Sequence, residues 1–442
     1  MKTDRKTVSS CETLIVTLAL SLTAAALLGQ EPGPQGAFQQ GAFTNLKRLD
    51  NPVNSEHWES MGSLSSDRLT LFFVSNRPPS VGSEFCVDLW VARRSSPDAP
   101  FGEPTNEGVL RNVNSAGDEC TPRLSADDRV LTFYSDRHAP SSGDYELYVA
   151  TRDEPSGEFR PAIGFSAAFP DSGISSPYAE FGQSMSCDSL AIYFSSDRPG
   201  GRGGFDLHVA TRDSPGGIFG NVRNLSALNT EAHEFSPIVS PDNLTLFFSD
   251  LMPPFREGGL GEGDIWMVTR SSTEEDWRSE DVRNLGWPIN SQFADLDFFV
   301  SHDWPAEGST IWFTSDRPRQ RHGNANCSTS PFADVIWDAD IYMATWVPAK
   351  PFRRGDADAN GVLAISDAIV ILGYLFSAAK APSCLAAADV TDAGALNITD
   401  PVYLLTHLFQ GGPAPPEPFK SCGSDPTEDD FILGCNSFPA CQ

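Results

Sequence analysis

The chain has 442 residues, which is too long for one ordinary hydrophobic core and suits a large domain followed by a smaller module. Acidic residues number 59 against 31 basic ones, and the formal net charge is -28. This balance excludes the basic footprint that a nucleic-acid partner requires, and it favours a soluble extracellular protein that attracts cations.

Residues 1–29 have the composition of a signal peptide. Lys2, Arg5 and Lys6 give a positively charged start, and the uncharged apolar stretch Leu14–Leu28 follows over 15 residues. That stretch is short for a transmembrane helix, although an uncleaved membrane anchor is the alternative interpretation. We therefore expect a secreted or cell-surface protein of bacterial type, with no membrane span once the signal is removed.

Five repeats occupy most of the remaining chain. The first reads SLSSDRLTLFFVSNR and then VDLWVARR, and the second reads RLSADDRVLTFYSDR and then YELYVATR. Their β-branched and aromatic runs are bounded by turn residues, and the aspartate of the Ser-x-Asp step can bond the backbone two residues on. Four such strands per repeat in radial array predict an all-β, five-bladed β-propeller over residues 38–350. The anchor residue of the motif recurs at Asn76, Asp136, Asp197, Asp250 and Asp316.

The fifth repeat predicts how the ring closes. This repeat runs directly into the C-terminal module and has no outer strand of its own. The segment GAFTNLKRLDNPVNS, which precedes the first repeat, has the pattern of the missing strand. Pairing the two ends of the repeat region in one blade would leave no unprotected sheet edge.

These repeats resemble the WD-like propeller repeats of the Tol-system periplasmic protein and its extracellular relatives. The resemblance covers roughly residues 40–348. It implies the propeller fold and a binding platform, and it names no ligand, because such folds carry many functions.

One acidic position recurs in register with the repeats. An acid lies six residues before each turn serine, and five carboxylates are predicted to form a ring near one mouth of the central channel. In one interpretation each acid pairs with an anchor arginine and ties neighbouring strands together. In the other, the ring holds a cation or a sugar and Glu234 is unpaired, since blade four has Leu251 where the others have arginine. The ring acids are Glu59, Glu119, Glu180, Glu234 and Asp295, and the anchor arginines are Arg77, Arg137, Arg198 and Arg317.

Two long loops are expected at the same end as the ring. They are residues 251–263 and 317–339, and the second is the best candidate for a ligand-gripping loop or, alternatively, a disordered insertion. Its chemistry-bearing residues are Arg319, Arg321, His322 and Trp337.

Eight cysteines follow the signal, an even number in an oxidising compartment. Cys86 and Cys120 are expected near one end of adjacent blades, where they could be bonded. Cys187 is expected in a turn at the opposite end and Cys327 in a long loop, so this pair is not expected to bond. The other four lie toward the C-terminus and allow three connectivities: Cys384, Cys422, Cys435 and Cys441.

After Pro351 the pattern becomes helical, beginning with a loop rich in carboxylates. In RRGDADANGVLAISDAIVILGYLF the residues at positions one, three, five, six, seven and twelve of the loop are Asp356, Asp358, Asn360, Gly361, Val362 and Asp367. Side-chain oxygens and the Val362 carbonyl at these offsets suit Ca²⁺, with glycine at the sharp turn. An accidental acidic turn before a helix is the alternative.

A degenerate copy of this loop follows. Asp389 occupies position one and Asp400 position twelve, but position three is Thr391 and position five is Ala393, which has no side-chain ligand. We expect weak or absent binding of calcium here, or binding helped by Asn397 and water.

The two loop-and-helix units resemble a type I dockerin over about residues 353–412, within a module that we place at 351–412. This resemblance implies calcium-dependent docking to a cohesin-like or cell-surface protein. It also implies recognition through loop positions ten and eleven, here Ile365, Ser366, Ile398 and Thr399. The proline-rich tail, 413–442, carries three cysteines and is expected to wrap and staple the module.

The sequence favours a secreted or cell-surface binding or scaffold protein with a ligand- or protein-binding propeller and a docking module. The rival is a polysaccharide-active hydrolase with the propeller as its catalytic domain and a glycan at its face. Such enzymes need non-equivalent carboxylates, whereas the acids seen here recur in every blade, so no catalytic residue is assigned. A structural surface-layer component is a third alternative.

Overall fold

The computed structural model describes residues 41–441 except 80–86, 139–144, 318–338, 349, 378, 424–434 and 436–437. The signal at 1–29 and the predicted ligand-gripping segment with Arg319, Arg321, His322 and Trp337 lie outside the described residues. Among the described residues, no helix has the length and apolarity needed to cross a membrane.

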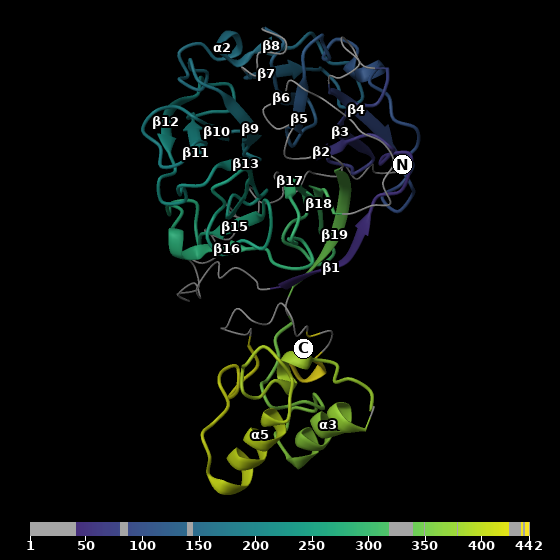
Figure 1. Cartoon of the computed structure of the whole chain (residues 1–442), viewed down its shortest axis with the longest axis vertical. Helices are drawn as coiled ribbons and strands as arrows, with labels where there is room; N and C mark the ends of the chain where they lie inside the picture. The colour runs from purple at the N-terminus through teal and green to yellow at the C-terminus, as the bar shows by residue number, and fades with distance from the viewer. Residues whose placement is uncertain are drawn as a thin grey trace, which may run out of the picture. The chain divides into compact units, whose positions relative to one another are not determined.

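Five antiparallel sheets surround a common axis and form the predicted five-bladed propeller (Figure 1). The innermost strand of each blade contacts that of the next blade, and the innermost strand of blade five contacts that of blade one. The prediction of a five-bladed all-β propeller is therefore confirmed, although blade one has three strands among the described residues and not the four expected. Blade one comprises β2 (Glu59–Leu64), β3 (Thr70–Ser75) and β4 (Asp88–Arg93); blade two β5 (Glu119–Leu124), β6 (Val130–Ser135), β7 (Glu146–Thr151) and β8 (Ile163–Gly164); blade three β9 (Glu180–Met185), β10 (Ala191–Ser196), β11 (Asp206–Thr211) and β12 (Gly220–Asn224); blade four β13 (Glu234–Val239), β14 (Thr245–Asp250), β15 (Ile265–Thr269) and β16 (Val282–Asn284); blade five β17 (Asp295–Val300), β18 (Thr310–Ser315) and β19 (Asp340–Pro348), with β1 (Gly41–Arg48).

The ring closes as the sequence predicts. Strand β1 pairs with β19 and becomes the outer strand of blade five. The Arg48 guanidinium donates two hydrogen bonds to the Asp340 carboxylate, at 2.6 and 2.8 Å. Blade five thus joins the start and the end of the propeller in one sheet and removes an open edge.

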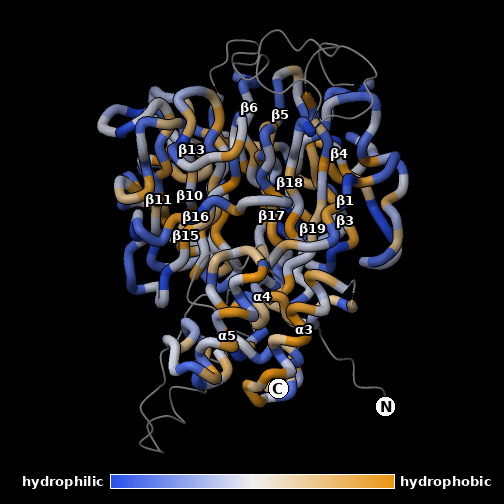
Figure 2. The backbone as a smooth tube through the Cα atoms, turned by 60° about the horizontal axis from the view of Figure 1, so that its bottom comes forward, coloured by the Kyte–Doolittle hydropathy of each residue, from blue (hydrophilic) through white to orange (hydrophobic). Residues whose placement is uncertain are grey.

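The hydrophobic core lies between the blades, because successive residues of a strand face opposite sides of its sheet. Phe72 packs with Leu131 and Phe133 of blade two, whereas its neighbour Phe73 packs with Trp312 and other residues of blade five. In Figure 2 apolar colour accordingly follows the strands, and hydrophilic colour follows many of the connecting loops.

The Ser-x-Asp step forms the expected turn between the first two strands of a blade. In blade one the Ser65 hydroxyl donates to the Asp67 carboxylate at 2.6 Å, and the same carboxylate accepts the Leu69 amide at 2.9 Å. This turn fixes the start of β3 locally, which explains why a short sequence motif identifies the blade.

The chain divides into two compact units, the propeller and a unit built around Trp346–Gln442. Buried Ala368 and Ile371 pack against Leu404 in the core of the second unit. Its helices are α3 (Ile365–Phe376), α4 (Leu385–Ala388) and α5 (Thr399–Gln410); short helices elsewhere are α2 (Phe165–Ala168), η1 (Gly108–Leu110), η2 (Ser279–Asp281) and η4 (Pro439–Cys441).

Two disulfides link the C-terminal cysteines: Cys384–Cys435 and Cys422–Cys441. One of the three connectivities is thereby selected, and the first bond ties the helical module to the tail. Cys120 is a free thiol, so the bond considered between Cys86 and Cys120 is not formed. Cys187 is disulfide-bonded, and because Cys327 lies outside the described residues, the expectation that these two do not pair stays a prediction.

Candidate functional site

The five ring carboxylates each stand at the first residue of an innermost strand, and all are fully buried. Each lies within ion-pair distance of one arginine. The closest nitrogen–oxygen distances are 2.7 Å for Arg77–Glu59, 2.9 Å for Arg137–Glu119, 3.0 Å for Arg198–Glu180, 3.4 Å for Arg256–Glu234 and 3.1 Å for Arg317–Asp295. The pairing interpretation of these acids is therefore the one that the structure supports.

Blade four departs from the sequence expectation. Leu251 stands where the other blades have arginine, yet Glu234 is not unpaired, because Arg256 from the following loop reaches it. The Arg256 guanidinium also donates to the Leu228 carbonyl at 2.8 Å and lies over the Trp266 ring. The alternative that left Glu234 available to a cation or sugar is wrong on this point.

Burial dominates the electrostatics of the ring. It raises the pKa of Glu119, Glu180 and Glu234 to about 7 and that of Asp295 to about 6, although the paired arginines oppose the rise. A hydroxyl four residues earlier, such as Ser115 for Glu119, also donates to each carboxylate. Carboxylates enclosed in this way tie strands together and are not open to a ligand.

The first predicted calcium loop brings its three carboxylates together. One oxygen from each of Asp356, Asp358 and Asp367 lies within 4.8 Å of the others. The Gly361 amide donates to Asp356 at 2.7 Å, and the backbone there has φ of +87°, which glycine adopts at low cost. Asp367 accepts the Ala364 amide at 2.8 Å and so also caps the start of α3.

The donor set of this loop fits a hard divalent cation. Burial and the neighbouring carboxylates raise the pKa of Asp367 to about 6, and burial raises that of Asp356. A cation among the three would relieve this repulsion, since opposite charge favours the ionised form. The Asn360 side-chain oxygen and the Val362 carbonyl belong to the same short loop and are the remaining candidate ligands.

The second loop repeats the same backbone frame without the third carboxylate. The Gly394 amide donates to Asp389 at 2.8 Å, and the Asn397 amide donates to Asp400 at 2.8 Å. The Thr391 hydroxyl donates to Asp400 at 2.7 Å and satisfies one of its oxygens. Ala393 contributes only its backbone amide to Asp389. The expectation of weak or absent calcium binding at this loop stays a prediction.

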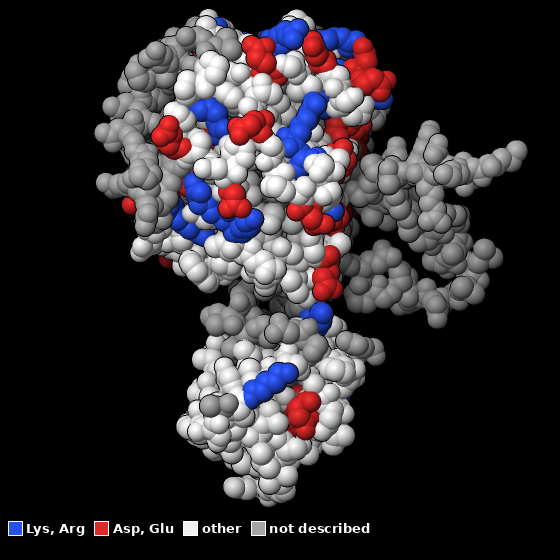
Figure 3. Space-filling view, turned by 90° about the vertical axis from the view of Figure 1, so that its right-hand side faces the viewer, with Lys and Arg blue, Asp and Glu red and all other residues white. Residues whose placement is uncertain are grey.

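Apolar side chains stand exposed beside both loops. Ile365 is 53% exposed and Ile398 is 48% exposed at equivalent places before or at the start of α3 and α5, and Ser366 and Thr399 follow them. The helices continue these faces with exposed Ile369 and Phe376, and with Val402 and Phe409. On the face drawn in Figure 3 the C-terminal unit carries few charged side chains. Exposed apolar side chains of this kind can form a contact surface for another protein.

Comparisons with known proteins assign no family to the chain. No family model matches the chain. No curated protein matches it either. Among solved structures, a putative TolB from Agrobacterium tumefaciens is 14% identical, with 71% of this chain and 100% of that chain covered and a TM-score of 0.34. An α-L-arabinofuranosidase from Lactobacillus brevis is 12% identical, covering 66% and 92%, with a TM-score of 0.39. A family 117 glycoside hydrolase from Zobellia galactanivorans is 14% identical, covering 71% and 91%, with a TM-score of 0.37. These similarities assign no function to the chain.

Proposed function

We propose that the chain is a secreted or cell-surface, non-catalytic binding protein. In this proposal the propeller is the binding platform, and the C-terminal unit binds Ca²⁺ and docks onto a cohesin-like or cell-surface protein. The observation that carries it is the convergence of Asp356, Asp358 and Asp367 at the spacing of a calcium loop.

The metal would act on the fold of the docking surface. Asp367 is both a candidate ligand and the residue that accepts the Ala364 amide at the start of α3. Ile365, at the first position of that helix, belongs to the surface proposed for docking. Calcium would therefore hold the end of the helix that presents this surface, and its removal would weaken docking as well as folding.

The hydrolase alternative finds less support in the ring. Its five acids are buried against arginines, so none is placed to act as a general acid, base or nucleophile on a glycan. A catalytic propeller would need other carboxylates that differ between blades.

Calcium binding is tested by calorimetric titration of the chelator-treated chain. The wild type is expected to bind one Ca²⁺, Asp367→Asn to bind at least about tenfold more weakly, and Asp400→Asn to bind like the wild type. Asp400 is the matched control because it occupies the same position in the degenerate loop. Unchanged binding in Asp367→Asn would contradict the proposal.

Docking is tested separately with cohesin-like domains and cell-surface proteins as probes. A specific complex should form with calcium, dissociate with chelator, and be weakened by Ile365→Asp or Ile398→Asp. A complex that is indifferent to both calcium and these substitutions would refute docking through this surface while leaving the metal site intact.

A further inference from the structure

The innermost strands share a second recurring feature, which begins two residues after the ring carboxylates. The pairing of each strand with its neighbour is irregular at or next to its third residue, where Thr121, Gly182, Ser236 and Asp297 adopt positive φ. A β-branched residue such as Thr121 rarely adopts this conformation, and strain of this kind gathers at functional sites. The fifth residues that follow are Ser63, Arg123, Ser184, Ile238 and Phe299.

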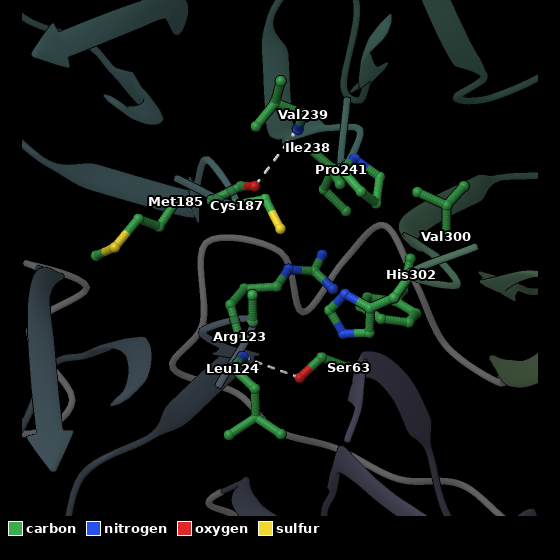
Figure 4. Close-up of a pocket in the computed structure, with 13 residues that line it drawn as sticks. Ser63, Arg123, Leu124, Met185, Cys187, Ile238, Val239, Pro241, Val300 and His302 are labelled. Carbon is green, nitrogen blue, oxygen red and sulfur yellow. Dashed lines mark hydrogen bonds between the residues drawn. The ribbon is translucent and has the colours of Figure 1, made fainter. Parts of the chain in front are cut away.

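These five fifth-position residues all line one cavity, so the cavity lies where the innermost strands of all five blades converge. Its volume is about 60 Å³, and Val239 and Val300 add further apolar wall. Figure 4 shows the Arg123 guanidinium extending into the middle of the cavity, toward His302. The cavity is separate from the ring carboxylates and from the calcium loops.

Arg123 is the exceptional side chain in this cavity. It is only 6% exposed, its Nη1 donates to the Gly62 carbonyl, and its Nε and Nη2 have no hydrogen-bond partner among the described residues. Arg152, in the same blade and 5% exposed, donates from Nε to the backbone carbonyl of Asp128 at 2.7 Å and from Nη1 to the backbone carbonyl of Gly157 at 3.2 Å. A buried guanidinium is thus satisfied elsewhere in this blade. Leaving two charged donors unpaired costs free energy unless something accepts from them.

Two hydroxyl groups of the cavity, those of Ser63 and Ser184, can also donate. The Ser63 hydroxyl oxygen accepts the Leu124 amide at 3.1 Å, and the Ser184 hydroxyl oxygen accepts the Val239 amide at 3.4 Å. Each hydroxyl proton can therefore be donated into the cavity.

Burial lowers the pKa of Arg123 to about 10, and the Asp297 carboxylate opposes this fall, so the guanidinium is cationic at neutral pH.

We propose that this cavity binds the carboxylate of a small organic monoanion through the Nε–Nη2 edge of Arg123, with its short apolar body against Ile238, Val239 and Phe299. Two adjacent N–H groups on one edge match the two oxygens of a carboxylate. The apolar walls and the nearby negative charge of Asp297 disfavour a strongly hydrated dianion such as sulfate. The inference is independent of the calcium proposal.

The test uses the full chain and propionate as the probe, with binding measured by saturation-transfer NMR in a carboxylate-free buffer. Propionate should bind the wild type and Arg212→Met with the same affinity. Arg212 is the matched control because it is a partly buried, hydrogen-bonded arginine away from the cavity. Arg123→Met should bind at least about tenfold more weakly, since it loses charge-assisted hydrogen bonds.

A second variant covers the case in which Arg123→Met does not fold. Ala126 lines the cavity and is half-buried, so Ala126→Phe fills space while retaining the guanidinium, and it should abolish binding. Absence of propionate binding by the wild type would overturn the proposal, as would unchanged binding by either Arg123→Met or Ala126→Phe. Tighter binding of sulfate than of propionate would overturn the assignment to a monocarboxylate.

Discussion

The buried ion pair of blade four offers a sharp test of how the propeller is held together. Arg256 comes from a loop, and its Nη1 lies 3.4 Å from Oε1 of the fully buried Glu234. Arg256→Met removes the positive charge and keeps much of the apolar side chain against Phe248 and Trp266. Glu234 would then be a buried carboxylate stabilised mainly by Thr230, whose hydroxyl donates to it at 2.5 Å.

The expected cost is large for one substitution. Breaking one partner out of a buried ion pair typically costs about 3–5 kcal/mol of unfolding free energy, and we expect about 3 kcal/mol because this distance is the longest of the five. The loss of unfolding free energy should become smaller as the pH is lowered. Burial already raises the pKa of Glu234 to about 7, and losing Arg256 raises it further, so acid pH protonates the stranded carboxylate.

The assay is urea unfolding followed by tryptophan fluorescence at pH 8.5 and pH 5.5. The double variant Glu234→Gln, Arg256→Met should recover most of the loss, because no buried charge remains. Arg223→Met is the control, since its surface pair with Asp276 is worth at most about 1 kcal/mol. A loss for Arg256→Met below about 1 kcal/mol at pH 8.5, or one that persists undiminished at pH 5.5, would refute the reasoning.

Three further predictions concern the whole ring, the tail and the ring closure. Because burial raises the pKa of the ring carboxylates, the folded state holds extra protons between about pH 4.5 and pH 7, so the propeller should melt at a higher temperature near pH 5.5 than near pH 8.5 by calorimetry. Cys384→Ser opens a link spanning 51 residues and should lower the unfolding free energy of the C-terminal unit by about 4 kcal/mol without moving the propeller transition. Phe43→Ala removes a buried ring that packs on Trp346 and should cost about 3–5 kcal/mol in chemical unfolding, and a loss near zero would mean that β1 does not close blade five.

The blades, their number and the closing strand could be predicted from the sequence because each depends on local signals. The Ser-x-Asp turn is completed within a few residues, as Ser65, Asp67 and Leu69 illustrate. The closing strand was predictable because the fifth repeat lacks an outer strand and the segment before the first repeat has the pattern of one additional strand. The convergence of Asp356, Asp358 and Asp367 was equally local, since all three lie within one short stretch of chain, whereas calcium binding there stays a prediction.

Pairings between distant residues could not be predicted in the same way. Arg256 is six positions after the anchor Asp250, whereas Arg198 directly follows the anchor Asp197, so the repeat pattern misses the partner in blade four. The cysteine connectivity likewise depends on how the tail returns to the helical module. Whether the Nε and Nη2 groups of Arg123 find hydrogen-bond acceptors depends on side chains from several blades. No sequence motif indicates whether those acceptors are present.

The position of a residue along the innermost strands nevertheless distinguishes structural residues from candidate ligand-binding residues. At the first position of each innermost strand the chain places an acid in every blade, and each acid is buried against an arginine, which is what a structural requirement shared by all blades produces. At the fifth position the five residues are of four types, and they converge on one cavity: Ser63, Arg123, Ser184, Ile238 and Phe299. A ligand at the axis of a ring of similar units is not itself fivefold symmetric, so its recognition must come from positions where the units differ. The fifth position meets that condition and the first does not. The sequence could have indicated this position if the repeats had been compared for where they diverge as well as for where they agree.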